Sequence, residues 1–254
     1  MSASLVGSEM CIRDRMKITN FEALIDERTM KKKTMIVLIS AFLLLSAFSC
    51  GGGNKANSTS EQSEETAVNV PQFDADSAYL YVKNQVDFGP RVPNTKEHVA
   101  CGNYLAGQLE AFGAQVTNQY ADLIAYDGTL LKARNIIGSY KPESKKRIAL
   151  FAHWDTRPWA DNDPDEKNHN TPILGANDGA SGVGALLEIA RLVNQQQPEL
   201  GIDIILLDAE DYGAPQFYTG QHKEEFWCLG SQYWARNPHV QGYNARFGIL
   251  LDMV

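Results

Sequence analysis

The sequence predicts an α/β protein, a three-layer α/β/α sandwich in which helices cover both faces of a mixed, largely parallel central sheet. One observation is a pair of predicted strands at residues 148–153 and 202–209, the second continuously apolar through residues 204–207, which is typical of strands buried on both faces. The other is a helical segment, residues 182–195, that lies between these two strands. Helices that alternate with buried strands imply a sheet between helices, with at least part of it parallel.

Apolar spacing and turn residues predict the other elements. Residues 74–86 carry apolar side chains at helical spacing, and the Gly-Pro-containing stretch 88–93 ends that helix. A second helix begins near Asn94 or Thr95, either of which can cap it, and Gly113 ends it. Further strands are expected at residues 114–120, 131–137 and 247–251.

Composition predicts a folded protein and argues against a nucleic-acid partner. The chain has 254 residues, a formal net charge of -8 and 44% hydrophobic residues, which is a globular composition. Its basic clusters at 31–33 and 145–147 are expected to be solvated, and a phosphate binder would need a larger basic patch. None of the four cysteines forms a C-x-x-C pair. We expect Cys101 and Cys228 to be half-buried thiols without a disulfide bond.

The N-terminal region is expected to lie outside the folded domain. Residues 4–15 resemble a translated sequencing-adapter sequence, so we interpret residues 1–29 as a non-native extension and Met30 as the natural start. Residues 30–50 resemble a bacterial lipoprotein signal peptide, with three lysines, a short apolar run and a small residue before Cys50. We expect an exported protein, periplasmic or on the cell surface, anchored to the membrane through lipidated Cys50. Ordinary secretion and an uncleaved anchor are the alternatives.

Two segments follow the predicted signal. Residues 51–70 are rich in Gly, Ser, Asn, Thr and Glu, and this composition predicts a flexible linker. Residues 71–254 contain the predicted helices and strands and form the expected domain.

Metal-competent side chains follow three of the predicted strands. The first apolar run ends at His153, and the second is followed by Glu210 and Asp211. The last strand is followed by Asp252, and a glycine-rich turn before the helix contributes Asp178. Ligands gather at the carboxyl ends of strands in open α/β sheets. Several carboxylates at one edge would repel one another, and a divalent cation is the simplest compensation.

Each of these residues also has a plainer interpretation. His153 could be an ordinary buried histidine, Asp178 could shape its turn, and the pair at 210–211 could be a solvated strand end. The glycines of the turn suggest a phosphate cradle, but no Walker lysine or Rossmann acidic partner follows them. The joint pattern is much rarer by chance than any of its parts, so we favour the metal site.

At these residues the chain resembles the zinc aminopeptidase and glutaminyl cyclase superfamily, over roughly residues 74–254. The resemblance rests on four segments, with looser support from residues 88–93 and 227–231. The four segments are AHWD at 152–155, GANDGASG at 175–182, DAED at 208–211 and LLD at 250–252. Residues 154–158 and 208–213 look most like bacterial members named as cyclases. The resemblance implies the phosphorylase/hydrolase-like fold of zinc exopeptidases.

The resemblance also implies a role for each site residue. Asp178 and Asp211 would bind zinc, and Glu210 would be the general acid and base. In the cyclase branch a single zinc is bound, and Asp252 hydrogen-bonds the reacting groups and helps to move the proton. In the aminopeptidase branch two zinc ions are bound, and His153 and Asp252 hold the second.

The implied activity is conversion of N-terminal glutamine in peptides or proteins to pyroglutamate, with release of ammonia. A di-zinc aminopeptidase and a non-catalytic peptide-binding lipoprotein are the alternatives. Trp154, Trp159 and Trp227 could wall a substrate pocket or simply pack in the core and loops. The superfamily's last zinc ligand is a histidine well beyond the position of Asp252. We therefore expect the sequence to lack the C-terminal part of the domain, because His169, His222 and His239 come too early to match.

Overall fold

A computed structural model describes residues 70–254 of the chain. The expectations for the extension, the signal peptide and Cys50 fall outside the described residues. Within the described part of the chain, no helix is both long and apolar enough to cross a lipid bilayer.

The centre of the domain is a five-stranded mixed sheet with the order β1-β2-β4-β3-β5. β1 (Gln115–Ile124) and β2 (Leu130–Tyr140) form an antiparallel hairpin, and β2 also pairs antiparallel with β4 (Gly201–Leu207). β3 (Arg147–His153) pairs parallel with β4 on one side and with β5 (Gly248–Leu250) on the other. The predicted α/β class and mixed sheet are confirmed. The parallel part is the β4-β3-β5 half, and the hairpin makes the other half antiparallel.

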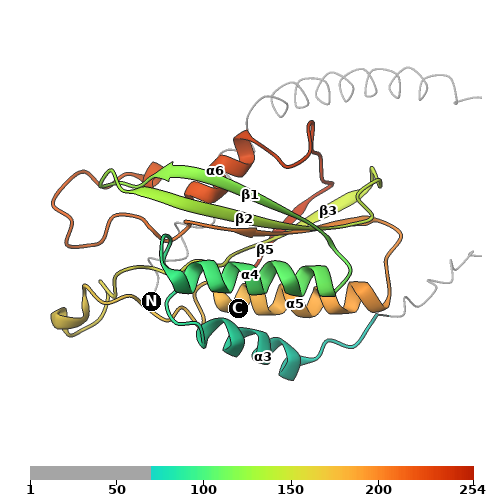
Figure 1. The fold of residues 1–254 in the computed structure, drawn as a ribbon, viewed down its shortest axis with the longest axis horizontal. Coiled ribbons are helices and arrows are strands. Elements are labelled where there is room, and N and C mark those ends of the chain that lie inside the picture. Colours follow the sequence, from blue (N-terminus) through green and yellow to red (C-terminus); the bar gives the residue numbers. More distant parts are fainter. Residues whose placement is uncertain (1–69) are drawn as a thin grey trace, which may run out of the picture. The chain divides into compact units, whose positions relative to one another are not determined.

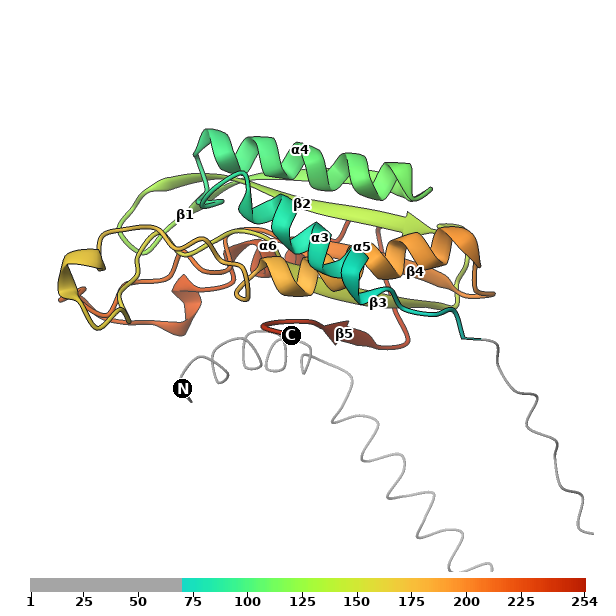
Figure 2. The same cartoon turned by 90° about the horizontal axis from the view of Figure 1, so that it is seen from below.

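Helices cover both faces of this sheet, as predicted. α3 (Ala75–Val86), α4 (Lys96–Ala111) and α5 (Ala180–Gln195) lie on one side, and α6 (Leu229–Arg236) lies on the other (Figures 1 and 2). The sequence analysis did not predict α6. Two short 3-10 turns, Glu166–Asn168 and Glu224–Phe226, lie in the long loops between these elements.

Helix boundaries follow local chemistry at the first two helices. The Asp74 carboxylate accepts hydrogen bonds from the first backbone N–H groups of α3, so this residue caps the helix rather than opening it. Thr95 caps α4 by accepting from the backbone N–H of His98, which selects Thr95 over Asn94 as the cap. Gly113 follows α4 with a φ of +78°, a left-handed conformation that ends helices.

The apolar runs are buried on both faces because alternate residues enter different cores. In β4, Ile204 and Leu206 belong to the core under α4 and α5, with both side chains fully buried. Ile205 and Leu207 point to the opposite core, where they meet Phe151 of β3. Each fully buried Leu or Ile contributes roughly 1.5–3 kcal/mol relative to an exposed position. The sheet is therefore fixed from both sides at the strands that carry the site.

Candidate active site

The three parallel strands end at one edge of the sheet, and the predicted site residues follow these ends. His153 is the last residue of β3, and Asp252 comes two residues after β5. The turn that contains Asp178 leads into α5, which packs closely on the end of β5. A Cβ atom on Gly182 would lie 2.4 Å from the backbone oxygen of Leu251. Only glycine allows this approach, which brings Asp178 and Asp252 to the same place.

His153, Asp178 and Asp252 form one compact group at this edge. Their candidate ligand atoms, one from each residue, all lie within 4.8 Å of one another. His153 Nε2 lies 3.0 Å from Asp178 Oδ1 and 3.6 Å from Asp252 Oδ1. Burial by itself lowers the pKa of His153, but the close carboxylates, including that of Asp155, outweigh burial and raise the pKa well above its ordinary value. The group therefore attracts positive charge.

Asp155 links the end of β3 to the loop after β4. Its side chain is fully buried, and Oδ1 lies 3.5 Å from His153 Nδ1. The same carboxylate accepts hydrogen bonds from the backbone N–H groups of Glu210 and Asp211, at 3.0 and 3.2 Å. Asp155 thereby sets the position of both acidic residues relative to His153. The sequence analysis included Asp155 in the AHWD segment but gave it no role.

The loop after β4 is bent by Asp208 and Ala209. Asp208 is fully buried and accepts hydrogen bonds from His98 Nε2 at 2.9 Å and from the backbone N–H of Arg134 at 2.6 Å. Ala209 has a φ of +50°, a left-handed conformation that is unfavourable for a residue with a Cβ atom. The bend takes Glu210 and Asp211 out of the strand direction and into the site, so Asp208 is an anchor of the loop.

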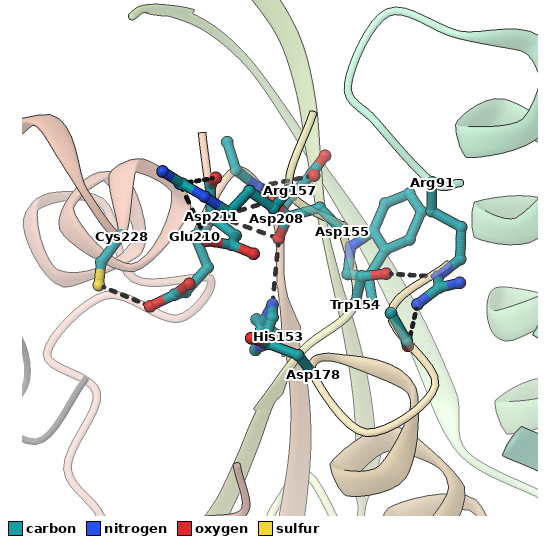
Figure 3. Close-up of polar contacts among 12 residues, drawn as sticks. Arg91, His153, Trp154, Asp155, Arg157, Asp178, Asp208, Glu210, Asp211 and Cys228 are labelled. Atoms are coloured by element: carbon teal, nitrogen blue, oxygen red, sulfur yellow. Dashed lines mark hydrogen bonds and ion pairs between the residues drawn. The ribbon is translucent and has the colours of Figure 1, made fainter. Parts of the chain in front are cut away.

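Glu210 lies in a buried position beside the Cys228 thiol. The Sγ–H of Cys228 donates to Glu210 Oε1 at 3.2 Å (Figure 3). Burial raises the pKa of Glu210 above its ordinary value, His153 and Cys228 act against this, and the Asp155 carboxylate adds to it. A carboxyl group with a raised pKa is suited to exchange protons near neutral pH. The environment of Glu210 is therefore compatible with the predicted role as general acid and base.

Asp211 is buried and only half satisfied. Oδ1 lies 3.4 Å from Arg157 Nη1, whereas Oδ2 has no hydrogen-bond partner among residues 70–254. Burial raises the pKa of Asp211 well above its ordinary value, and the charges of Glu210 and Asp178 raise it further. Burying a carboxylate oxygen without a partner is costly, which suits an oxygen that binds a cation.

The donor set fits zinc. Imidazole nitrogen and carboxylate oxygen are ordinary zinc ligands, and atoms that share one zinc ion lie within roughly 4 Å of each other. The group of His153, Asp178 and Asp252 approaches that spacing, and Asp211 Oδ2 supplies a further buried oxygen. The pairing of Asp178 with Asp211 at one ion stays a prediction.

Trp154 belongs to the core, not to a substrate wall. It is fully buried, stacks on His98 with ring centroids 4.3 Å apart, and donates from Nε1 to the Arg134 carbonyl. Trp159 and Trp227 are half-buried and lie over the Arg157 guanidinium at 5.7 and 4.8 Å.

The two cysteines of the described domain agree with the expectation that they form no disulfide bond. No disulfide joins Cys101 to Cys228, and both are fully buried rather than half-buried. Burial raises the pKa of the Cys101 thiol to about 12, as expected for a thiol in an apolar core.

Arg91 is a further residue whose role the sequence analysis did not identify. It is fully buried, and its guanidinium donates to the backbone oxygens of Trp154, Leu174 and Gly175 at 3.0, 2.7 and 2.7 Å (Figure 3). These bonds tie the end of β3 to the turn that holds Asp178. Arg91 therefore fixes two parts of the site without touching it.

Comparison with known proteins agrees with this geometry. Residues 135–254 match the model of Peptidase family M28. The chain is 95% identical to Bacteroides thetaiotaomicron glutaminyl cyclase, crystallised with N-acetylhistamine; the TM-score is 0.73, and the match covers 73% of this chain and 64% of that one. Identity, TM-score and both coverages are the same for a leucine aminopeptidase precursor from Bacteroides thetaiotaomicron VPI-5482. A Zn-dependent exopeptidase from Parabacteroides distasonis ATCC 8503 is 64% identical, with a TM-score of 0.72 and coverage of 73% and 63%.

The chain spans 64% of the length of the first two of these proteins. The similar structures include proteins named as cyclases and proteins named as peptidases. The chain is thus similar to zinc exopeptidases and glutaminyl cyclases over most of its described domain, and its residues 135–254 match Peptidase family M28.

Proposed function

We propose that the protein is a zinc-dependent glutaminyl cyclase, which converts N-terminal glutamine of peptides to pyroglutamate and releases ammonia. The observation that carries this proposal is the 95% identity to Bacteroides thetaiotaomicron glutaminyl cyclase over 73% of the chain. The buried acidic group at the carboxyl ends of β3, β4 and β5 supports it, because that edge is where a substrate of an α/β enzyme is bound.

In this proposal Asp178 and Asp211 hold the zinc ion of the cyclase. The ion would polarise the γ-carboxamide carbonyl of the substrate glutamine when bound. The unsatisfied Oδ2 of Asp211 supports its assignment as a ligand. Arg91 and Asp155 keep the two ligand-bearing segments in register, so the site is held by the fold before any ligand binds.

Glu210 moves the proton. It takes a proton from the α-amino group as the amine nitrogen bonds to the carbonyl carbon of the γ-carboxamide, Cδ, and it returns the proton to the departing carboxamide nitrogen. The bond between Cδ and that nitrogen breaks, ammonia leaves, and no net proton is consumed. Asp252 hydrogen-bonds the reacting groups during this transfer, from its place 3.6 Å from His153.

The test uses the full-length protein, produced without the predicted signal, and a peptide that begins with glutamine. Mass spectrometry should show loss of ammonia with the peptide chain intact, and chelation should abolish it until zinc is restored. Glu210→Gln should also abolish it, while Glu143→Gln, at an exposed turn position, should not. Cyclisation that continues in the Glu210→Gln variant would contradict the assigned role.

A di-zinc aminopeptidase is the second candidate. Two observations favour it: the equal identity to a leucine aminopeptidase precursor, and the compact group that includes His153 and Asp252, the residues expected to hold a second zinc. Glu210 would then deprotonate the attacking water. Release of a free N-terminal amino acid, with two zinc ions per chain by elemental analysis, would support this candidate. A folded, zinc-loaded protein that turns over neither glutamine-led peptides nor ordinary peptides would instead support a peptide-binding lipoprotein.

We also propose that the protein is exported and anchored to a membrane through lipidated Cys50, facing the periplasm or the cell surface. The lysine-rich start, short apolar run and small residue before this cysteine support the proposal. Cells grown with labelled palmitate should yield labelled protein in the membrane fraction, and Cys50→Ser should remove the label. A wild-type protein that stays unlabelled would contradict the anchor.

A further inference from the structure

Arg157 is a buried cation that contacts the proposed zinc ligand Asp211 from the side away from His153 (Figure 3). It leaves the end of β3 four residues after His153. Its Nε and Nη2 donate to the two oxygens of Asp161, at 2.7 and 2.6 Å, which is a bidentate pair. Its Nη1 lies 3.2 Å from the backbone oxygen of Asp211 and 3.4 Å from Oδ1.

Hydrogen-bond acceptors and two indole rings fix the orientation of the Arg157 guanidinium. Its Nη2 also lies 3.5 Å from the Ala214 carbonyl, so all three guanidinium nitrogens contact acceptors. The indole rings of Trp159 and Trp227 lie over the guanidinium at 5.7 and 4.8 Å. Asp161 is itself fixed, because Oδ2 also accepts from the backbone N–H of Gln216 at 2.8 Å.

The two carboxylate oxygens of Asp211 have different environments. Oδ1 faces the guanidinium, and Oδ2 has no hydrogen-bond partner in the described domain. We propose that Arg157 is a positioning residue for the metal, which holds Asp211 by Oδ1 so that Oδ2 alone is presented as a ligand. The inference rests on the zinc assignment made above, and it is independent of which reaction the site performs.

The planar fork, not the positive charge, does the positioning. A bare charge beside Asp211 would compete with zinc for the carboxylate and weaken binding. The fork instead fixes rotation of the carboxylate, because its bidentate pair with Asp161 holds Nη1 where it contacts both Oδ1 and the backbone oxygen of Asp211. Lysine keeps the charge but has no planar fork, so Arg157→Lys separates the two effects.

The experiment measures zinc affinity of the full-length protein by competition with a chromogenic chelator, without substrate. Arg157→Lys should bind zinc about 10–100-fold more weakly than wild type, the usual cost of losing an outer contact to a metal ligand. Arg147→Lys is the matched control. Arg147 is a buried arginine at the opposite end of β3, paired through Nε and Nη2 with both oxygens of Asp203, and it should leave zinc affinity unchanged.

Three outcomes would overturn the inference: unchanged zinc affinity in a folded Arg157→Lys protein, an equal loss in the Arg147→Lys control, or tighter binding by Arg157→Gln. Tighter binding would show that the charge competes with zinc. If Arg157→Lys does not fold, Asp161→Asn breaks the bidentate pair while keeping Arg157, and it too should weaken zinc binding. Wild-type affinity in Asp161→Asn would then overturn the inference. A failed cyclase assay with normal zinc binding would count against the proposed reaction alone.

Discussion

At the scale of single residues, the contact between Cys228 and Glu210 has a testable consequence. Cys228 is buried in a left-handed conformation, with a φ of +54°, and its backbone N–H donates to the Glu210 carbonyl at 2.9 Å while its thiol donates to the carboxylate. Both bonds hold Glu210 in place. A side chain that keeps a donor should therefore keep the position of the carboxylate.

We expect Cys228→Ala to lower kcat for glutamine-led peptides about fivefold, with KM little changed. One hydrogen bond is worth roughly 1 kcal/mol, and a factor of ten in rate corresponds to about 1.4 kcal/mol. Cys228→Ser retains an O–H donor and should lie near wild type. Steady-state kinetics of both variants checks this; equal losses in Ala and Ser would mean that the thiol acts through packing alone.

Single residues also show what sequence could and could not provide. Asp178 and Asp252 were found because strand direction and a glycine-rich turn bring them to one edge. The roles of Arg91 and Arg157 depend on contacts to positions 63 and 54 residues away, at Trp154 and Asp211. No local pattern encodes such a contact, so neither role could be predicted without the fold.

At the scale of secondary-structure elements, the approach of α5 to β5 sets the geometry of the site. The Cβ of an alanine at position 182 would collide with the backbone of Leu251, and backbone cannot move aside as a flexible side chain can. The helix would have to shift away from the strand. The turn with Asp178 would then move relative to Asp252.

We expect Gly182→Ala to lower the urea midpoint of unfolding and to weaken zinc binding. Gly107→Ala in α4 is the same substitution in another helix, where an added Cβ meets nothing within 4 Å. It should raise stability by roughly 0.5–1 kcal/mol, because alanine is the better helix former, and leave zinc affinity alone. Denaturant titration and chelator competition measure both effects. Stabilisation by both alanines would refute the close approach.

Elements with a strong local period were predicted best. The ends of β4 and α5 differ from expectation by a few residues because tertiary contacts decide them; Asp208 leaves the strand to bind His98. Strands β1 and β2 are longer than predicted. Their antiparallel pairing continues to Ile124 and Leu130, and it is this pairing, not the local sequence pattern, that extends them. The eight-residue α6 is too short to show a helical period and lies against the sheet by its aromatic side chains.

At the scale of the whole molecule, a buried polar network far from the site holds the other end of the sheet. Asp203 of β4 is fully buried and accepts hydrogen bonds from Ser139, Arg147 and Tyr243, each at 2.7 Å. This network joins β2, β3 and the segment before β5. The sequence predicted these strands but gave no sign that a charge would be buried between them.

The Asp203 network should make stability depend on pH in one direction. Burial acts to raise the pKa of Asp203, but His239, Arg147, Ser139 and Tyr243 outweigh it and hold the pKa far below its usual range. An aspartate with a lowered pKa in the folded state contributes stability above the unfolded pKa of about 3.9, and that contribution is lost as pH falls further.

Asp203→Asn should therefore be much less stable than wild type at pH 7, and the difference should shrink below about pH 4. Urea unfolding at several pH values measures this, with Asp122→Asn at an exposed ion pair as the control that should change little at any pH. A stability difference that stays constant down to about pH 3 would show that the network holds the sheet by shape and not by the charge of Asp203.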